Sequence, residues 1–248
     1  MILTFPPARS SIDMNISVAL AAYNGERYIG EQIESILPQL GEDDEIVVSD
    51  DNPAGKTRAV VEFYSAYDRR VRYVEGTGEG VCRNFENAIL NCSGNVIFLC
   101  DQDDVWLPGK VERVMEAIDG GADVVLHDAM MTDGDLNVTE PSFFKLNGSG
   151  RGLIKNLVKN SYMGCCMAFR RDFESAFMPF PEDLAMHDWW IGLNAEAKGK
   201  VALIYEPLIK HRCHGGNVTG GATSAAQKMK WRFQMAKDML RFKDSDEH

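Results

Sequence analysis

A chain of 248 residues with 45% hydrophobic and 25% charged residues can bury a full core and has the composition of a globular protein. Its formal net charge of −11 argues against a general nucleic-acid-binding protein, which would need a basic face for phosphate contacts. Such acidity fits a protein that recruits cations to handle an anionic ligand.

The first half of the chain alternates predicted strands and helices. We expect strands at 15–22, 45–51, 71–75, 95–100 and 122–131, and helices from about 29 to 37 and at 56–67, 81–92 and 108–119. Strands that alternate with helices through short connections imply an α/β fold, a doubly wound and mostly parallel sheet with helices on both faces. Ligands bind such sheets at the carboxyl ends of the strands.

Polar residues gather at three of these strand ends: Tyr23 and Asn24, then Asp50 and Asp51, then Asp101, Asp103 and Asp104. Three carboxylates within four positions repel one another and raise one another's pKa unless a positive group neutralises them. A divalent cation is the favoured explanation, because hard cations take carboxylate oxygens as ligands. The alternative is a turn with aspartates that cap the following helix.

The second half is less regular. A polar, glycine-rich segment at 132–152 precedes a turn and strand within 160–173, a helix at 186–199 and an extended segment at 201–212. A basic helical tail follows at 227–243, with Met229, Phe233, Ala236 and Leu240 on one face. Such a helix either lies on an anionic membrane surface near a lipid-linked acceptor, or packs on the domain or on a second subunit in a homodimer.

The six cysteines form no CxxC pair and no spacing typical of secreted disulfide frameworks. We therefore interpret them as reduced thiols in a cytoplasmic protein. No apolar run approaches the ~18 residues needed to span a bilayer. Residues 1–13 carry no charge before their apolar residues, so we expect a disordered leader there and not a signal peptide.

Seven segments in order resemble the family 2 glycosyltransferases, which have the GT-A fold. They are ALAAYNGERYIGEQIESIL, IVVSDD, GEGVCRNFENAI, DQDDVWLPGK, NSYMGCCMAFRR, HDWW and HRCHGGNV. The similarity is strongest to bacterial rhamnosyltransferase-like members. It implies a GT-A domain over 14–220, with a nucleotide-binding half at 14–131 and an acceptor-binding half at 132–220. The basic helical tail, at 221–248, lies beyond this resemblance.

The resemblance also implies which residues hold the nucleotide. Tyr23 and Asn24 would line the base, and Asp51 would accept a hydrogen bond from the N3–H of uracil or thymine. Asp50 is a secondary candidate for that contact, and Arg83 would lie against the nucleotide. The alternatives are a cap and turn for the paired aspartates and a surface ion pair for Arg83.

The next residues would serve the sugar diphosphate. Asp101 would lie near the ribose, and Arg212 would face the diphosphate. Asp103 and His214 would ligate a divalent ion, and mixed oxygen and nitrogen ligands favour Mn²⁺ over Mg²⁺. A structural role for His214 is the alternative. Asp104 is expected to cap the following helix and orient the cluster.

Sugar transfer also needs a group that takes the proton of the acceptor hydroxyl, and Asp188 is the candidate general base. It opens an apolar helix and is flanked by Trp189 and Trp190, which would exclude water from it or stack on a sugar ring. One base opposite the leaving group implies a single displacement with inversion. The alternative is that Asp188 only caps its helix.

The expected function is inverting, metal-dependent transfer of a sugar from dTDP-rhamnose or a UDP-hexose. The acceptor would be a hydroxyl of a glycan or lipid-linked saccharide in bacterial surface polysaccharide biosynthesis. A sugar nucleotidyltransferase should carry a glycine- and lysine- or arginine-rich loop after the first strand, which AAYNGERY lacks. A catalytically silent nucleotide-sugar binding module would lose the base, whereas Asp188 is present.

One departure from the family bears on the base. Members usually continue Gly-Ser-Thr-Asp-Gly-Thr after the paired aspartates, whereas this chain has Asn52-Pro53-Ala54-Gly55-Lys56-Thr57. Pro53 fixes φ and removes a hydrogen-bond donor, so this loop and the base selectivity it supports differ from the family pattern.

Overall fold

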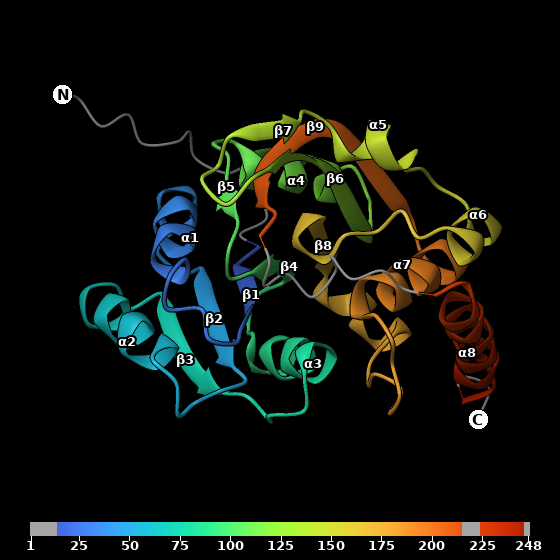
Figure 1. The fold of residues 1–248 in the computed structure, drawn as a ribbon, viewed down its shortest axis with the longest axis horizontal. Helices are drawn as coiled ribbons and strands as arrows, with labels where there is room; N and C mark the ends of the chain where they lie inside the picture. Colours follow the sequence, from blue (N-terminus) through green and yellow to red (C-terminus); the bar gives the residue numbers. More distant parts are fainter. Residues whose placement is uncertain (1–13, 215–223, 246–248) are drawn as a thin grey trace.

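The computed structural model describes residues 14–214 and 224–245, and a nine-stranded sheet runs through this part of the chain (Figure 1). The strand order is β3-β2-β1-β4-β8-β6-β9-β5, with β7 paired to β6. The strands are β1 Ile16–Ala22, β2 Glu45–Asp50, β3 Val71–Glu75, β4 Val96–Asp101, β5 Val105–Trp106, β6 Val124–Thr132, β7 Val138–Glu140, β8 Met167–Arg170 and β9 Val201–Arg212.

The helices of the described residues cover this sheet. They are α1 Ile29–Ile36, α2 Thr57–Tyr67, α3 Val81–Asn91, α4 Lys110–Asp119, α5 Phe143–Asn147, α6 Leu153–Val158, α7 His187–Lys198 and α8 Ala225–Ser245. Short 3₁₀ segments lie at Leu37–Gln39, Gly164–Cys166 and Arg171–Ala176. The helices predicted in the first half and at 186–199 are therefore confirmed, with ends that differ by one or two residues.

The first half forms the doubly wound part. Strands β3, β2, β1 and β4 are all parallel, and every residue of β1 and β2 is buried. The chain returns past β1 to reach β4, and because such crossovers are right-handed, α3 lies on the face opposite α1 and α2 (Figure 1). The predicted α/β class with helices on both faces is confirmed.

The second half of the sheet is mixed in direction. β8 runs antiparallel to both β4 and β6, while β6 and β9 are parallel. Two short strands, β5 and β7, were not predicted, because two or three residues are too few to show an alternating pattern. β5 follows the aspartate cluster directly and pairs with the end of β9, the last strand of the described residues. This pairing places the aspartate cluster beside the end of β9.

The predicted leader at 1–13 lies outside the described residues. The division into a nucleotide-binding and an acceptor-binding half stays a prediction. The tail is helical, as predicted, and forms α8. Among the described residues, no helix combines the length and the apolar character needed to cross a bilayer.

Candidate active site

The ends of three parallel strands meet at one edge of the sheet. In the register of the ladders, Asp50 lies beside Ala22, and Asp101 lies beside Ala21. The polar residues that follow β1, β2 and β4 are therefore neighbours in space, although they are up to about eighty residues apart in sequence. This is the edge at which open α/β sheets bind ligands.

Asp51 holds the glycine loop that follows β3. Its two carboxylate oxygens accept hydrogen bonds from the backbone N–H of Gly78 at 2.7 Å and of Gly80 at 2.8 Å. Both glycines have positive φ, at 73° and 94°, a conformation that side chains rarely adopt. Each carboxylate oxygen has a second lone pair, so the half-buried Asp51 can accept a further hydrogen bond from a ligand.

Asp50 has a different environment. Its carboxyl group is fully buried and accepts from the backbone N–H of Asn52 at 3.1 Å and from the hydroxyl of Tyr73 at 3.2 Å. Burial raises its pKa, and the neighbouring Asp51 adds to the effect. These are the contacts of a turn, the alternative considered for this residue. Asp51 is thus the aspartate of the pair that presents a partly exposed carboxylate.

The turn after β1 is hydrogen-bonded to the segments that follow β2 and β4. The backbone N–H and C=O of Tyr23 pair with the side-chain amide of Gln102 at 2.9 and 3.0 Å, while the ring of Tyr23 is exposed. Asn24 adopts a positive φ of 52°, and its side-chain oxygen accepts from Asn52 at 2.8 Å. Asn52 thereby anchors the unusual loop before Pro53. The role of Gln102 was not predicted, because it depends on a contact between separate strands.

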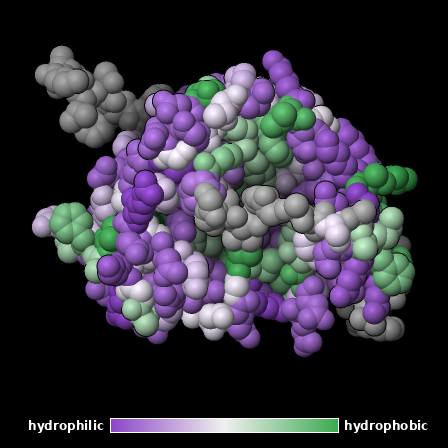
Figure 2. Space-filling view, viewed as in Figure 1, coloured by the Kyte–Doolittle hydropathy of each residue, from purple (hydrophilic) through white to green (hydrophobic). Residues whose placement is uncertain are grey.

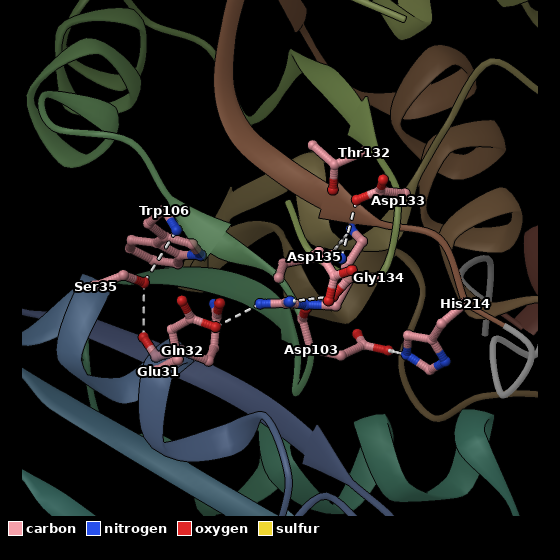
Figure 3. Close-up of polar contacts among 12 residues, drawn as sticks. Glu31, Gln32, Ser35, Asp103, Trp106, Thr132, Asp133, Gly134, Asp135 and His214 are labelled. Atoms are coloured by element: carbon pink, nitrogen blue, oxygen red, sulfur yellow. Dashed lines mark hydrogen bonds and ion pairs between the residues drawn. The ribbon is translucent and has the colours of Figure 1, made fainter. Parts of the chain in front are cut away.

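Asp103 and His214 come together as predicted. The Nε2 of His214 lies 2.8 Å from Oδ2 of Asp103, although 111 residues separate them (Figure 3). Burial raises the pKa of Asp103, and the charge of Asp104 raises it further. The ring of His214 stacks on Tyr28 with centroids 5.0 Å apart, a contact that the sequence did not indicate.

These two residues fit a divalent ion. Ligand atoms of a Mg²⁺-type ion lie about 2.1 Å from the metal, so two donors 2.8 Å apart can share one ion. Burial raises the pKa of the adjacent Asp101 to about 7, and the carboxylates of Asp104 and Asp103 contribute. A bound cation would reduce the electrostatic repulsion among these neighbouring carboxylates.

Arg212 contacts several protein groups, and its predicted place facing the diphosphate stays a prediction. It is buried and its guanidinium donates to the backbone oxygens of Asp103 at 2.8 Å and Gly134 at 2.7 Å, and pairs with Glu31. Figure 3 shows Glu31, Gly134 and Asp103 in one group of polar contacts. Arg212 also lies over the ring of Tyr28, 4.7 Å from its centroid. It braces β9 against the loop that carries Asp103.

Asp104 does not cap the following helix, so that expectation is wrong. The N-cap of α4 is Gly109, and Asp104 instead pairs with Nδ1 of His211 at 2.9 Å and accepts from the backbone N–H of Arg212 at 3.1 Å. Burial opposes charge on His211, but the adjacent carboxylate outweighs it and raises the pKa of His211 to about 10.

The same buried cluster includes Cys165. Ligand-type atoms of Asp104, Cys165 and His211 lie within 4.8 Å of one another, so these residues are a second arrangement that could hold a metal ion. Here, however, the charges of Asp104 and His211 already compensate each other. We interpret the cluster as an internal ion pair that fixes the end of β9.

Asp188 lies in the first turn of α7, and it is 7% exposed. The N-cap of α7 is Met186, while Asp188 accepts a hydrogen bond from the backbone N–H of Trp189 at 2.6 Å. Burial raises the pKa of Asp188 to about 7. The charge of Asp188 also contributes to the raised pKa of Asp101, so the two carboxyl groups share one electrostatic environment.

The two tryptophans around Asp188 belong to the core. Trp189 donates its indole N–H to the backbone oxygen of Asn156 and Trp190 donates to that of Phe177, each at 2.8 Å, and both side chains are buried. They exclude water from the start of α7 and do not offer a face to a sugar ring. Of the two predicted roles, the structure supports the first.

The Gly-Cys segment reaches α7 at Gly164. A Cβ at Gly164 would lie 2.7 Å from Nε2 of His187 and 3.7 Å from Cβ of Asp188. His187 is buried and stacks on Phe85 with centroids 4.0 Å apart, so it has little room to move. Glycine at position 164 is therefore required by the close approach of this backbone to His187, the residue before the candidate base.

Arg83 is engaged by protein groups. It donates to the backbone oxygens of Phe180 at 3.2 Å and Pro181 at 3.0 Å, and it forms an ion pair with Glu86. These contacts tie α3 to the segment before α7 and include the ion pair considered as the alternative, while the contact of Arg83 with the nucleotide stays a prediction.

Comparisons with known proteins agree on the class of the chain. The sequence profile described as glycosyl transferase family 2 matches residues 17–177. An uncharacterized glycosyltransferase of Nostoc sp. is 25% identical over 236 residues, covering 91% of this chain and 73% of the relative. The dTDP-rhamnosyl transferase RfbG of Shigella flexneri is 25% identical over 238 residues, covering 85% and 77%.

Other relatives extend the comparison to Gram-positive bacteria and to solved structures. The putative teichuronic acid biosynthesis glycosyltransferase TuaG of Bacillus subtilis is 23% identical over 225 residues, covering 86% of this chain and 84% of the relative. Among crystal structures, S. aureus TarS 1-349 in complex with UDP-GlcNAc has a TM-score of 0.70 at 18% identity, covering 92% of this chain and 67% of that one. The predicted GT-A fold is confirmed by this likeness.

Proposed function

Because the chain belongs to glycosyl transferase family 2, we propose that it transfers a sugar from a nucleoside diphosphate to an acceptor hydroxyl with inversion of configuration. The main observation in support of this proposal is that three kinds of functional group lie in one region of the molecule. These are the half-buried Asp51 at the strand ends, the Asp103 and His214 pair, and the buried carboxyl group of Asp188.

On the donor side, Asp51 would accept a hydrogen bond from the N3–H of uracil or thymine. This favours a UDP- or dTDP-linked sugar, because cytosine has no hydrogen at N3. The names of two relatives point the same way, since one is a dTDP-rhamnosyl transferase and another was crystallised with UDP-GlcNAc. Tyr23 and Asn24 would border the base from the turn after β1.

Asp103 and His214 would hold Mn²⁺ or Mg²⁺ beside the diphosphate. When bound, such an ion supplies Lewis-acid stabilisation of the negative charge that develops on the leaving group. Arg212 acts on this site through the backbone of Asp103, which it holds in place. The internal pair of Asp104 and His211 restrains the same loop from the other side.

On the acceptor side, Asp188 would take the proton of the attacking hydroxyl. A carboxyl group with a pKa of about 7 accepts protons far more readily than an ordinary aspartate and is still ionised in a large fraction of molecules near neutral pH. A base that acts opposite the leaving group gives inversion in one displacement. A silent binding module would have no use for such a carboxyl group, and this favours an enzyme.

The proposed acceptor is a hydroxyl of a glycan or lipid-linked saccharide in bacterial surface polysaccharide biosynthesis. The names of RfbG and TuaG support this class, because rhamnose transfer and teichuronic acid synthesis concern cell-surface polymers.

A screen of nucleotide sugars tests the proposal. The full chain is incubated with dTDP-rhamnose, UDP-glucose, UDP-GlcNAc, and CDP- and GDP-linked sugars, with Mn²⁺ or with EDTA, and nucleoside diphosphate release is measured. We expect release from a UDP- or dTDP-linked donor that stops in EDTA. Release only from CDP- or GDP-linked donors would contradict the role of Asp51, and undiminished release in EDTA would contradict metal dependence. The anomeric configuration of the product, read by NMR, tests inversion.

A further inference from the structure

The helix α8 packs on the protein by one face only. Met235 and Asp238 are buried, and Trp231 and Met239 are partly buried against the core. These positions recur at helical spacing and form the inner stripe, which contacts α6. The expectation that the tail packs on the domain therefore holds for this face.

The opposite face of α8 carries a second apolar stripe that is open to solvent. Met229, Phe233 and Leu240 are all exposed, with 73% of Phe233 accessible. Lys230, three positions before Phe233, and Lys237, four positions after it, flank this stripe and are exposed as well. The predicted apolar face of the tail is thus the face that the domain leaves uncovered.

The neighbouring helix α6 continues this surface. Ile154 is 79% exposed, and Val158, one turn later, is also exposed. The exposed basic residues Arg151, Lys155 and Lys159 surround them. Figure 1 shows α6 and α8 side by side at one end of the molecule, and Figure 2 shows hydrophobic surface at the same edge. We call the exposed residues of α6 and α8 together the α6–α8 surface.

Charge separates this surface from the rest of the protein. Residues 225–245 contain six basic and two acidic residues, a net charge of +4, which leaves −15 on the remaining residues of a chain whose net charge is −11. Residues 141–160 contain four basic residues and no acidic residue. The exposed aromatic and aliphatic side chains therefore lie in the most basic part of an acidic protein.

We propose that the α6–α8 surface docks on an anionic lipid bilayer. An exposed apolar stripe flanked by lysines is the pattern of helices that lie in the membrane interface, where the apolar side chains enter the headgroup boundary and the lysines meet lipid phosphates. The net charge of the remaining protein is repelled by the same lipids. The bilayer would therefore hold the molecule by this end only.

A second copy of the chain is the other candidate occupant, and the charges favour the bilayer. A protein–protein interface of this composition would bury several lysines, and lysine is depleted in such interfaces. On a bilayer the lysine stems lie along the apolar boundary while their ammonium groups remain at the lipid phosphates, so no lysine charge is buried.

The surface is also close to the acceptor side of the candidate active site. The backbone oxygen of Asn156 on α6 accepts the indole N–H of Trp189 at 2.8 Å, and Trp189 follows Asp188 directly in α7. A bilayer bound at α6 would thus lie one helix away from the candidate base. The link to a lipid-linked acceptor rests on the proposed function, whereas docking on lipid does not.

Co-sedimentation with vesicles tests the docking. The full chain should sediment with vesicles of phosphatidylglycerol and phosphatidylcholine in equal parts, and not with phosphatidylcholine alone. Added salt should weaken the binding. The double variant Lys230→Gln, Lys237→Gln should bind about thirtyfold more weakly, since each lysine contributes about 1 kcal/mol and 1.4 kcal/mol is a factor of ten. Phe233→Ser should weaken binding about tenfold or more.

A matched control is Phe63→Ser, which removes another exposed aromatic side chain from α2, at the opposite end of the molecule (Figure 1). It should bind vesicles like the unaltered protein. Absence of binding to phosphatidylglycerol vesicles would overturn the proposal, as would equal losses in Phe63→Ser and Phe233→Ser. A dimer in light scattering that Phe233→Ser dissociates would assign the surface to a second copy.

Calorimetry of UDP binding in Mn²⁺ on the same preparations separates this inference from the proposed function. Phe233→Ser should bind UDP like the unaltered protein, because Phe233 is remote from the strand ends. A protein that binds UDP but no vesicles would overturn the docking alone. A protein that binds vesicles but neither UDP nor dTDP would leave the docking supported and contradict the proposed donor site.

Discussion

The substitution Asp188→Asn keeps the shape of the side chain but removes its ability to take a proton. If Asp188 is the general base, kcat should fall by about a hundredfold or more, the usual contribution of a positioned base. Donor binding should stay within about twofold, because the loss falls on the chemical step and not on ground-state contacts. The amide oxygen can still accept the hydrogen bond that Trp189 donates, so the start of α7 should be preserved.

The same substitution should stabilise the folded protein at neutral pH. In the unfolded chain Asp188 loses its proton near its ordinary pKa of 3.8, whereas in the folded protein burial raises the pKa to about 7. The unfolded state is therefore stabilised relative to the folded state as the pH rises from about 4 to about 7. The full cost of ionising the buried group is roughly 4 kcal/mol at most. Asparagine has no charge to bury and avoids this cost.

Two measurements check both effects. The pH profile of kcat/KM for the unaltered enzyme should rise about tenfold per pH unit below about pH 7 and level off above it. Thermal unfolding should show a higher melting temperature for Asp188→Asn at pH 8, and a difference that shrinks toward pH 4. The matched control is Asp172→Asn, which alters an exposed aspartate paired with Arg170; it should leave the kcat/KM profile unchanged and should not raise the melting temperature at pH 8. Turnover above about a tenth of the wild-type rate would mean that Asp188 only structures α7.

Three further predictions concern the donor site and the glycine beside the base. Asp103→Ala should weaken UDP binding in Mn²⁺ at least about tenfold in calorimetry, and unchanged affinity would contradict its role as a metal ligand. Unaltered protein should prefer UDP over CDP by about tenfold or more, and Asp51→Ala should reduce this ratio in competition assays, whereas a constant ratio would exclude Asp51 from base recognition. Gly164→Ala should lower kcat at least about tenfold without weakening UDP binding, because its Cβ would meet His187 at 2.7 Å. Gly134→Ala, whose Cβ would meet no atom within 4 Å, is its control, and equal effects of the two glycine variants would contradict this reasoning.

The sequence by itself determined every helix and all strands but β5 in the first half, and the positions of its candidate functional aspartates. β1 and β4 are runs of buried residues, and the helices between the strands carry apolar residues at helical spacing, so local pattern was sufficient. Asp51 and Asp103 could be located because parallel strands present their carboxyl ends at one edge. That Asp103 and His214 lie together was implied by the resemblance to the family, since no local signal in the sequence joins them.

Contacts between distant residues were decided only by the tertiary structure. The residue type of Arg212 suggested a ligand contact, and only the tertiary structure shows that Glu31, 181 positions earlier, pairs with it. Asp104 has the residue type and position of a helix cap, yet His211 takes its carboxylate. Both contacts depend on β9, which carries Arg212 and His211 and whose place in the sheet depends on β5 and β6.

Which face of the tail helix packs on the protein was also decided only by the tertiary structure. Helical periodicity assigns Met229, Phe233 and Leu240 to one face of α8, and it assigns Trp231, Met235 and Met239 to the other. Both stripes are apolar, so the sequence determined that the segment is an amphipathic helix but not which stripe faces the protein. Packing on α6 buries Met235 and leaves Phe233 exposed, because a helix that docks on one neighbour can cover only the stripe turned toward it.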